Sequence, residues 1–388
     1  MNNISKQFYF FVFVFSFLSV IFFGVGCTKQ RDGENVIRIG AVLSLSGPQA
    51  QFGQRMREGI EMAVSEFNTK SNSVRLKVIF EDSQTSPKVG LSAYQKLSAV
   101  ENCSVVFGNG SFLGQAVAGA ADSNSAPFVA LGTSIPHLTE GRDRLIRVSY
   151  TAESTTTPLA KYVGKTHHRI AILSVEDEYG KVASAAFKRE LPQSGSTIVF
   201  EESFPLQMSD VAILAKKCLD ATPDAVVFCG YGPNLLPLIQ RMKALGSGVK
   251  IYADVALADP TVYTDISKGV EGTITVCLPI NAGIVSTANQ RDFLNSYRAK
   301  HANVNPDIWT TLAYDAVRIV LAAIETNNFK SDDLKGSIAR LREYPGVSGN
   351  ILFTESADSI VTMIISRISE GRLVPIEVNS VNADAKLN

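Results

Sequence analysis

Short apolar runs alternate with longer segments of helical period over most of the chain. Read as strands and helices in turn, these segments occupy residues 36–45, 53–68, 74–81, 88–100, 104–107, 113–122 and 127–131. The helical segments carry apolar residues on one face, whereas the short runs are rich in Val and Ile. Strands joined by crossover helices form a parallel sheet that is covered on both faces, so the pattern predicts an α/β fold.

The alternation starts again after about residue 150. The second set of strands and helices occupies residues 169–175, 182–190, 197–202, 211–219, 225–229, 235–245, 250–253 and 269–277. A long helix is expected at 308–325 and strand-like segments at 351–376. These strands suffice for two doubly wound sheets, and no flexible linker separates them. We therefore expect two lobes between which the chain crosses several times, which forms a hinge.

The first 26 residues have the composition of an export signal. A polar start with Lys6 precedes an almost unbroken apolar run at 8–23, and small residues lead to Cys27. This order resembles a bacterial lipoprotein signal, in which the peptide is cleaved before the cysteine and the Cys27 thiol carries the lipid. We expect a signal peptide at 1–26, a linker at 27–35 and a lipid-anchored protein in the cell envelope or periplasm. The alternative is an uncleaved anchor, since about 20 apolar residues can span a bilayer.

Charge and cysteine content exclude several classes of protein. The 388 residues include 37 basic and 37 acidic side chains, so the formal net charge is zero and no nucleic-acid partner is expected. The cysteines after the export signal form no CxxC or Cys/His cluster, which argues against a zinc site. They are Cys103, Cys218, Cys229 and Cys277. The last two fall in apolar runs, where a buried free thiol is commoner than a disulfide.

Motifs of catalysis and cofactor binding are missing from the sequence. It contains no GxSxG, no HExxH and no P-loop. The glycines at 108–114 are spaced GxGxxxG rather than GxGxxG, and no acidic residue follows about 20 positions later, so a dinucleotide fingerprint is poorly supported. We therefore expect no catalytic residue, no cofactor and no metal.

Residues that directly follow strands are the candidates for a ligand site, because ligands of open α/β sheets bind outside the carboxyl ends of strands. The segment 108–111, which ends in Ser111, precedes a helix whose free N–H groups can hold a carboxylate. A plain turn is the alternative. Gly132, Thr133 and Ser134 follow the next strand and place two hydroxyls in a similar position, unless they only cap a helix.

Three further candidates follow strands of the second set. Tyr179 and Tyr231 can close over a ligand with ring and hydroxyl, although tyrosines at strand ends are also ordinary interface residues. Asp254 follows the strand at 250–253 and offers a carboxylate to a ligand ammonium group. A solvated turn aspartate is the equal alternative at that position.

Several short motifs follow one another in a characteristic order and spacing. They occupy residues 37–40, 46–53, 81–83, 136–139, 178–180, 230–233, 270–272 and 313–317. Together they resemble the leucine/isoleucine/valine-binding proteins among the type I periplasmic solute-binding proteins of ABC transporters. The resemblance covers nearly all of the chain after the export signal. It implies two Rossmann-like lobes, joined by three crossovers, that close on a ligand and present the closed form to a transporter.

The resemblance also implies roles for single residues. Phe52 matches an aromatic residue that lines the pocket, and the loop 132–134 matches the one that holds the α-carboxylate and α-ammonium groups. Tyr179 and Tyr231 match second-lobe tyrosines that close over the ligand.

The sequence departs from the family pattern in two places. The ligand-binding serine after the third strand falls at Phe112, with Ser111 just before it, so that a hydroxyl is lost and space is filled. The acidic residue that takes the ammonium falls at Val255, one place after Asp254, and a shift of one residue would restore it.

The implied function is capture of a small ligand in the cleft between the lobes and its delivery to an ABC transporter permease. An amino acid or a related small acid or amide is the expected ligand. A sensor module of the same fold and an exported enzyme are the alternatives. The first lobe is expected at 36–148 and 280–355, and the second at 149–279 and 356–388.

Overall fold

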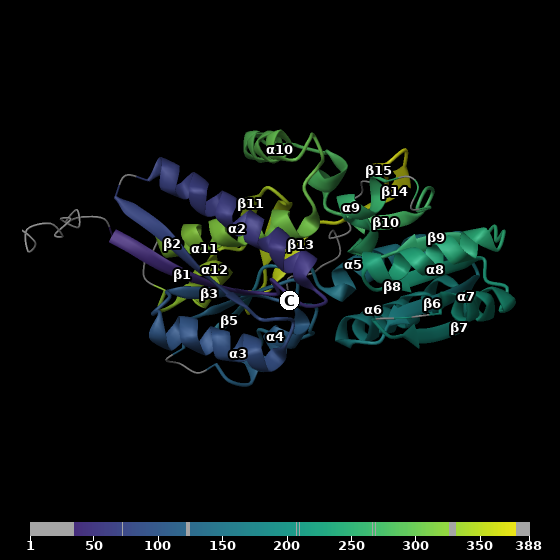
Figure 1. Cartoon of the computed structure of the whole chain (residues 1–388), viewed down its shortest axis with the longest axis horizontal. Helices are drawn as coiled ribbons and strands as arrows, with labels where there is room; N and C mark the ends of the chain where they lie inside the picture. The colour runs from purple at the N-terminus through teal and green to yellow at the C-terminus, as the bar shows by residue number, and fades with distance from the viewer. Residues whose placement is uncertain are drawn as a thin grey trace, which may run out of the picture.

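Two lobes lie along the longest axis of the molecule, and each is built on its own large sheet (Figure 1). The computed structural model describes residues 35–377 apart from 72, 122–124, 207, 209, 266, 268 and 326–330. The expected signal peptide and Cys27 lie outside the described residues. No helix in the described ranges combines the length and the apolar character that crossing a membrane requires.

The first lobe contains a parallel five-stranded sheet of order β2-β1-β3-β4-β5. Its strands are β1 (Asn35–Leu43), β2 (Val74–Asp82), β3 (Val105–Asn109), β4 (Phe128–Leu131) and β5 (Leu145–Arg147). Its crossover helices are α2 (Ala50–Lys70), α3 (Pro87–Gln95), continued by a π-helical turn at Lys96–Val100, and α4 (Ser111–Ala118). All residues of β3 and β4 are buried, as expected for strands covered on both faces.

The second lobe contains a seven-stranded sheet of order β15-β14-β10-β9-β8-β6-β7. Its strands are β6 (Arg169–Val175), β7 (Thr197–Phe204), β8 (Ala225–Cys229), β9 (Lys250–Ala253), β10 (Ile274–Cys277), β14 (Ile364–Ser369) and β15 (Arg372–Glu377). Its helices are α5 (Ala152–Gly164), α6 (Glu178–Glu190), α7 (Val211–Asp220), α8 (Gly232–Ala244) and α9 (Pro260–Tyr263). The last two strands are antiparallel, whereas β6 to β10 pair in parallel.

The chain returns to the first lobe between β10 and β14. This segment contains α10 (Ala288–Lys300), α11 (Ile308–Glu325), α12 (Leu334–Leu341) and a small antiparallel sheet of β11 (Glu343–Gly346), β12 (Gly349–Phe353) and β13 (Ser359–Val361). Helix α11 packs on α2 so closely that a Cβ atom at Gly59 would lie 2.2 Å from the Thr310 carbonyl oxygen.

Over the described residues, the chain thus passes between the lobes three times, after β5, after β10 and after β13. This confirms the predicted α/β fold with two doubly wound lobes joined by three crossovers. The lobe boundaries expected from the sequence stay a prediction. Strand β13 pairs with β12 and carries the third sheet to Val361, past the expected limit of 355.

The strand expected at 269–277 is shorter than predicted. Gly269 and Gly272 have φ angles of +69° and +77°, which belong to turns, and strand β10 begins only at Ile274. The predicted strand was too long because Val270, an apolar and buried residue, lies in the turn before β10. Elements that the pattern did not predict include β5, α5, α10 and α12.

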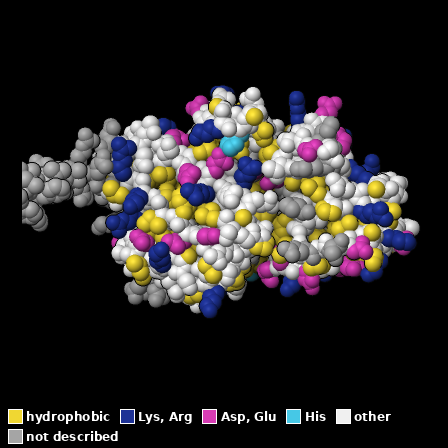
Figure 2. Space-filling model, in the orientation of Figure 1, with side chains coloured by type: hydrophobic (Ala, Val, Ile, Leu, Met, Phe, Trp, Pro, Cys, Tyr) yellow, Lys and Arg dark blue, Asp and Glu magenta, His cyan; other side chains and the backbone are white. Residues whose placement is uncertain are grey.

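Charged side chains of both signs are interspersed over both lobes on the face shown in Figure 2. This distribution agrees with the formal net charge of zero. Cys103, Cys218, Cys229 and Cys277 are buried free thiols. Among the described residues, no group of three or more His, Cys, Asp or Glu side chains is arranged to hold a metal ion.

Candidate functional site

The two large sheets place their ligand-binding edges opposite one another. Strands β2-β1-β3-β4-β5 and β7-β6-β8-β9-β10 follow the same doubly wound order, in which the direction of winding reverses between the first and third strands of each set. Ligands of such sheets bind at this reversal, outside the carboxyl ends of the strands. In this protein the carboxyl ends of β1 and β3 and those of β6 and β8 all lead to one cavity.

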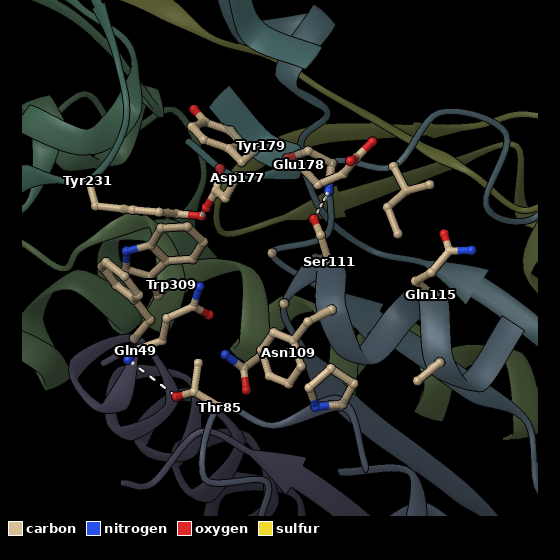
Figure 3. A pocket seen from close by; sticks show the side chains of 18 of the residues that line it. Gln49, Thr85, Asn109, Ser111, Gln115, Asp177, Glu178, Tyr179, Tyr231 and Trp309 are labelled. Atoms are coloured by element: carbon tan, nitrogen blue, oxygen red, sulfur yellow. Dashed lines mark hydrogen bonds between the residues drawn. The ribbon is translucent and has the colours of Figure 1, made fainter. Parts of the chain in front are cut away.

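The cavity has a volume of about 730 Å³ and is lined by both lobes (Figure 3). Seven of the nine predicted ligand residues line it, namely Phe52, Ser111, Phe112, Gly132, Ser134, Tyr179 and Tyr231. Thr133 and Asp254 do not. A volume in this range suits a small organic ligand.

The first-lobe wall is formed around the start of α4. Gly110 precedes this helix with φ +92°, and no side chain caps the helix N-terminus. Ser111 is the first helical residue, and its Oγ accepts a hydrogen bond from the Ser134 backbone N–H at 3.2 Å. The wall therefore joins a helix N-terminus to two serines, a combination of N–H and O–H donors suited to a carboxylate. The Phe112 ring lines the cavity beside them.

The loop after β4 separates two neighbouring hydroxyls. Gly132 has φ +55°, and a Cβ atom there would lie 2.9 Å from both Met56 and Trp309, so glycine is required. Ser134 lines the cavity, whereas the Thr133 hydroxyl turns inward and donates to the Leu131 carbonyl at 3.2 Å. The sequence could not distinguish these neighbours, because the direction of each side chain depends on how the loop is packed.

A buried arginine holds this loop from behind. Arg147, at the end of β5, donates from Nη1 to the carbonyls of Thr133 and Ile135 at 3.3 and 2.6 Å. Its Nε donates to Asp358 Oδ1 at 2.6 Å, and its Nη2 pairs with the other oxygen of that carboxylate. The guanidinium thus connects the loop at 132–134, called the ligand loop below, to the segment that leads into β13.

The second-lobe wall begins at the N-terminus of α6. Asp177 is the N-cap of this helix and accepts a hydrogen bond from the Gly180 N–H at 2.9 Å. Its other oxygen accepts from the Tyr231 hydroxyl at 2.9 Å. Partial burial raises the pKa of Asp177, and these hydrogen bonds oppose the rise. Figure 3 shows Asp177, Tyr179 and Tyr231 together on this side of the cavity.

Asp254 lies behind this wall and is fully buried. Its carboxylate accepts from the Tyr179 hydroxyl at 2.7 Å, the Gly230 N–H at 3.2 Å and the Ala256 N–H at 3.0 Å. Burial raises the pKa of Asp254 to about 7, and the Tyr179 hydrogen bond opposes the rise. Asp254, which the sequence suggested as a partner of a ligand ammonium group, therefore lies outside the cavity lining and fixes the Tyr179 hydroxyl instead.

Aromatic rings form a continuous chain across the two lobes. Ring centroids lie 5.6 Å apart for Tyr179 and Tyr231, 5.6 Å for Tyr231 and Phe52, and 5.0 Å for Phe52 and Trp309. Tyr150 continues the chain at 5.7 Å from Trp309. Because Phe52 and Trp309 belong to the first lobe and both Tyr179 and Tyr231 to the second, the rings bridge the cleft.

Several cavity residues were missed as ligand candidates from the sequence. Tyr150 lies on the crossover after β5 and Trp309 near the start of α11, so neither directly follows a predicted strand. Asn109 is buried at the end of β3, where its Oδ1 accepts from the Ser44 N–H at 2.7 Å. Asn109 could have been found from the sequence, because it lies in the same segment after a strand as the candidate Ser111. Gln49, Thr85, Gln115, Asp177 and Glu178 complete the polar lining.

The family model described as "Periplasmic binding protein" matches residues 36–369. The chain belongs to this family. Membership confirms the predicted family and shows a substrate-binding protein rather than an enzyme. Proteins of this family are exported to the periplasm, bind small molecules and work with ABC transporter components.

Three known proteins illustrate the range of this similarity. A Leu/Ile/Val-binding protein of Rhizobium johnstonii is 27% identical over 83% of this chain and 88% of its own length. A leucine-binding protein from Thermotoga maritima matches with a TM-score of 0.79 and 23% identity, covering 88% of this chain and 97% of the other. A Rhodopseudomonas palustris solute-binding protein in complex with 3,4-dihydroxybenzoic acid has the same TM-score at 19% identity, covering 88% and 96%.

Proposed function

We propose that this protein captures an amino acid or a related small acid or amide in the cavity between its lobes and delivers it to an ABC transporter permease. The observation that carries the proposal is the composition of the cavity. Donors at the start of α4 face tyrosines of the second lobe across a space of about 730 Å³. A ligand that contacts both walls stabilises the closed arrangement relative to the open one.

The two walls have separate tasks in this proposal. Ser111, Ser134 and the uncapped start of α4 bind a carboxylate or amide oxygen of the ligand. Phe52, Tyr179 and Tyr231 cover its apolar part, because aromatic rings bury a large area at defined geometry. Phe112 takes the place of a ligand-binding serine in the family pattern, with the Ser111 hydroxyl beside it.

The small molecule that co-purifies with the mature protein is the first test. It is released by mild denaturation, identified by mass spectrometry and returned to the refolded protein in a calorimeter. We expect one equivalent of a small acid or amide to bind, and transporter vesicles to take it up only when the binding protein is present. Two results together would refute the proposal: no small molecule co-purifies with the protein, and no amino acid, amide or aromatic acid of a test panel binds to it.

The lipid anchor is a separate part of the proposal and rests on the sequence around Cys27. A Cys27→Ser variant should leave the membrane fraction, because position 27 then has no thiol to carry the lipid. A variant that stays in the membrane with its first 26 residues intact would show an uncleaved anchor instead.

A further inference from the structure

The charge of the cavity lining is one-sided. Asp177 and Glu178 line the cavity, and no Lys, Arg or His is among its described lining residues. The Arg147 guanidinium lies behind the ligand loop, where it is paired with Asp358 and donates to two carbonyls. An anion in the cavity would therefore meet two carboxylates without a free cation, and it would have to rely on N–H and O–H donors alone.

The position of Asp254 removes it as a direct partner of the ligand. Its two oxygens already accept three hydrogen bonds, and the Tyr179 hydroxyl stands between the carboxylate and the cavity. Tyr179 is itself buried and stacks on Tyr231 at 5.6 Å between ring centroids. A ligand group would have to displace this tyrosine to reach Asp254.

Asp177, in contrast to Asp254, lines the cavity. One of its oxygens caps α6 and the other accepts from the Tyr231 hydroxyl, which fixes the carboxylate at the cavity wall. A carboxylate can accept about four hydrogen bonds in all, and the N–H groups of Gly180 and Tyr179 and the Tyr231 hydroxyl supply three, so acceptor capacity remains on a group that lines the cavity. The rings of Tyr231 and Tyr179 lie beside it, and aromatic faces attract cations.

We propose that the Asp177 carboxylate is the counter-ion of a positively charged amino group on the ligand, so that the site selects zwitterionic acids over acids without an amine. The inference rests on the proposed function. The ligand carboxylate lies at Ser111 and Ser134 on one lobe and its ammonium at Asp177 on the other, and the two charges together bridge the cleft.

The test compares acids with and without an amine in the full mature protein. Calorimetry is run with the common L-amino acids, with 4-methylpentanoate and 3-phenylpropanoate as the amine-free counterparts of L-leucine and L-phenylalanine, and with benzoate. We expect binding only among the amine-bearing probes. Tight binding of an amine-free acid, or release of such an acid from the purified protein, would overturn the inference and leave the proposed function standing. No binding by any probe and no co-purified molecule would overturn both.

Four variants separate the carboxylates from one another. Asp177→Asn should weaken the best amine-bearing probe roughly ten- to hundredfold, the effect of losing a hydrogen bond between charged groups. Asparagine caps helices as well as aspartate does, so α6 should remain intact. Asp210→Asn is the matched control, since Asp210 caps α7 by accepting from the Ala212 N–H but does not line the cavity. A larger loss in Glu178→Gln or Asp254→Asn than in Asp177→Asn would overturn the assignment to Asp177.

Discussion

At the scale of single residues, neighbours in the ligand loop have different surroundings and should have different effects. Ser134→Ala removes a hydroxyl from the cavity lining and should weaken ligand binding roughly ten- to hundredfold, because a hydrogen bond to a charged group contributes about 1.5–3 kcal/mol. Thr133→Val removes the adjacent hydroxyl, which donates only to the Leu131 carbonyl, and should lower stability while affinity is kept. Calorimetry on both variants checks the contrast, and equal losses of affinity would contradict it.

Asp254 should make folding stability depend on pH. Burial raises its pKa to about 7 from the ordinary value of 3.8, so the folded state retains a proton that the unfolded chain releases. This contribution to stability is fully present below the unfolded pKa and is lost as pH rises through about 7, with a slope of up to about 1.4 kcal/mol per pH unit.

The Asp254→Asn variant isolates this effect. Its free energy of unfolding, measured by urea denaturation between pH 4 and 8, should fall less steeply with pH than that of the wild type. Asp315, whose pKa burial raises to about 6, titrates in the same direction and remains in both proteins, so only the difference between the curves is informative. Parallel curves would mean that folding does not raise the pKa of Asp254.

At the scale of elements, the short strand β5 matters through its last residue. Arg147→Leu should destabilise the protein by about 3–5 kcal/mol, because it leaves the Asp358 carboxylate and the carbonyls of Thr133 and Ile135 without their donor. Ligand affinity should also fall, since the loop that carries Ser134 loses its support. Denaturant unfolding and calorimetry measure the two effects.

Arg147→Lys is the control for this element. It keeps the positive charge but loses the bidentate hydrogen bonds to the Asp358 carboxylate, so its stability should lie between that of the leucine variant and the wild type. A leucine variant with wild-type stability and affinity would show that the loop holds its shape without the Arg147 guanidinium.

At the scale of the whole molecule, the aromatic chain across the cleft should favour closure. Tyr179→Ala combined with Tyr231→Ala removes the ring that contacts Phe52 and the ring stacked on it, so ligand should bind weakly and leave the lobes open. Moving a population from 1:99 to 99:1 requires a preference of about 5.5 kcal/mol for the closed state, which a few charge-assisted hydrogen bonds plus aromatic burial can supply.

Small-angle scattering with saturating ligand measures this effect as the change in radius of gyration. The double phenylalanine variant, which keeps both rings and loses both hydroxyls, should still compact more than the double alanine variant. If the double alanine variant compacts as far as the wild type, these tyrosines do not drive closure.

The sequence alone determined the alternation of strands and helices in both lobes, although not every element. Wholly buried strands such as β8 are continuous apolar runs, and α11 occupies the range 308–325 that its apolar face predicts. The carboxyl ends of the strands then indicated Ser134, Tyr179 and Tyr231, because the winding of an α/β sheet brings those ends to one edge. These properties depend on local pattern, which each segment carries within itself.

Only the tertiary structure decided which side chains reach the cavity. Asp254 and Asp177 both follow strands, yet one is enclosed behind Tyr179 and the other lies on the cavity wall. Trp309 joins the site from the start of α11, far along the chain from the other lining residues. Short elements such as β5 carry too few residues to show a period, so they depend on pairing with neighbours already in place. The direction of a side chain is set by distant segments that pack around it, and no local pattern records those contacts.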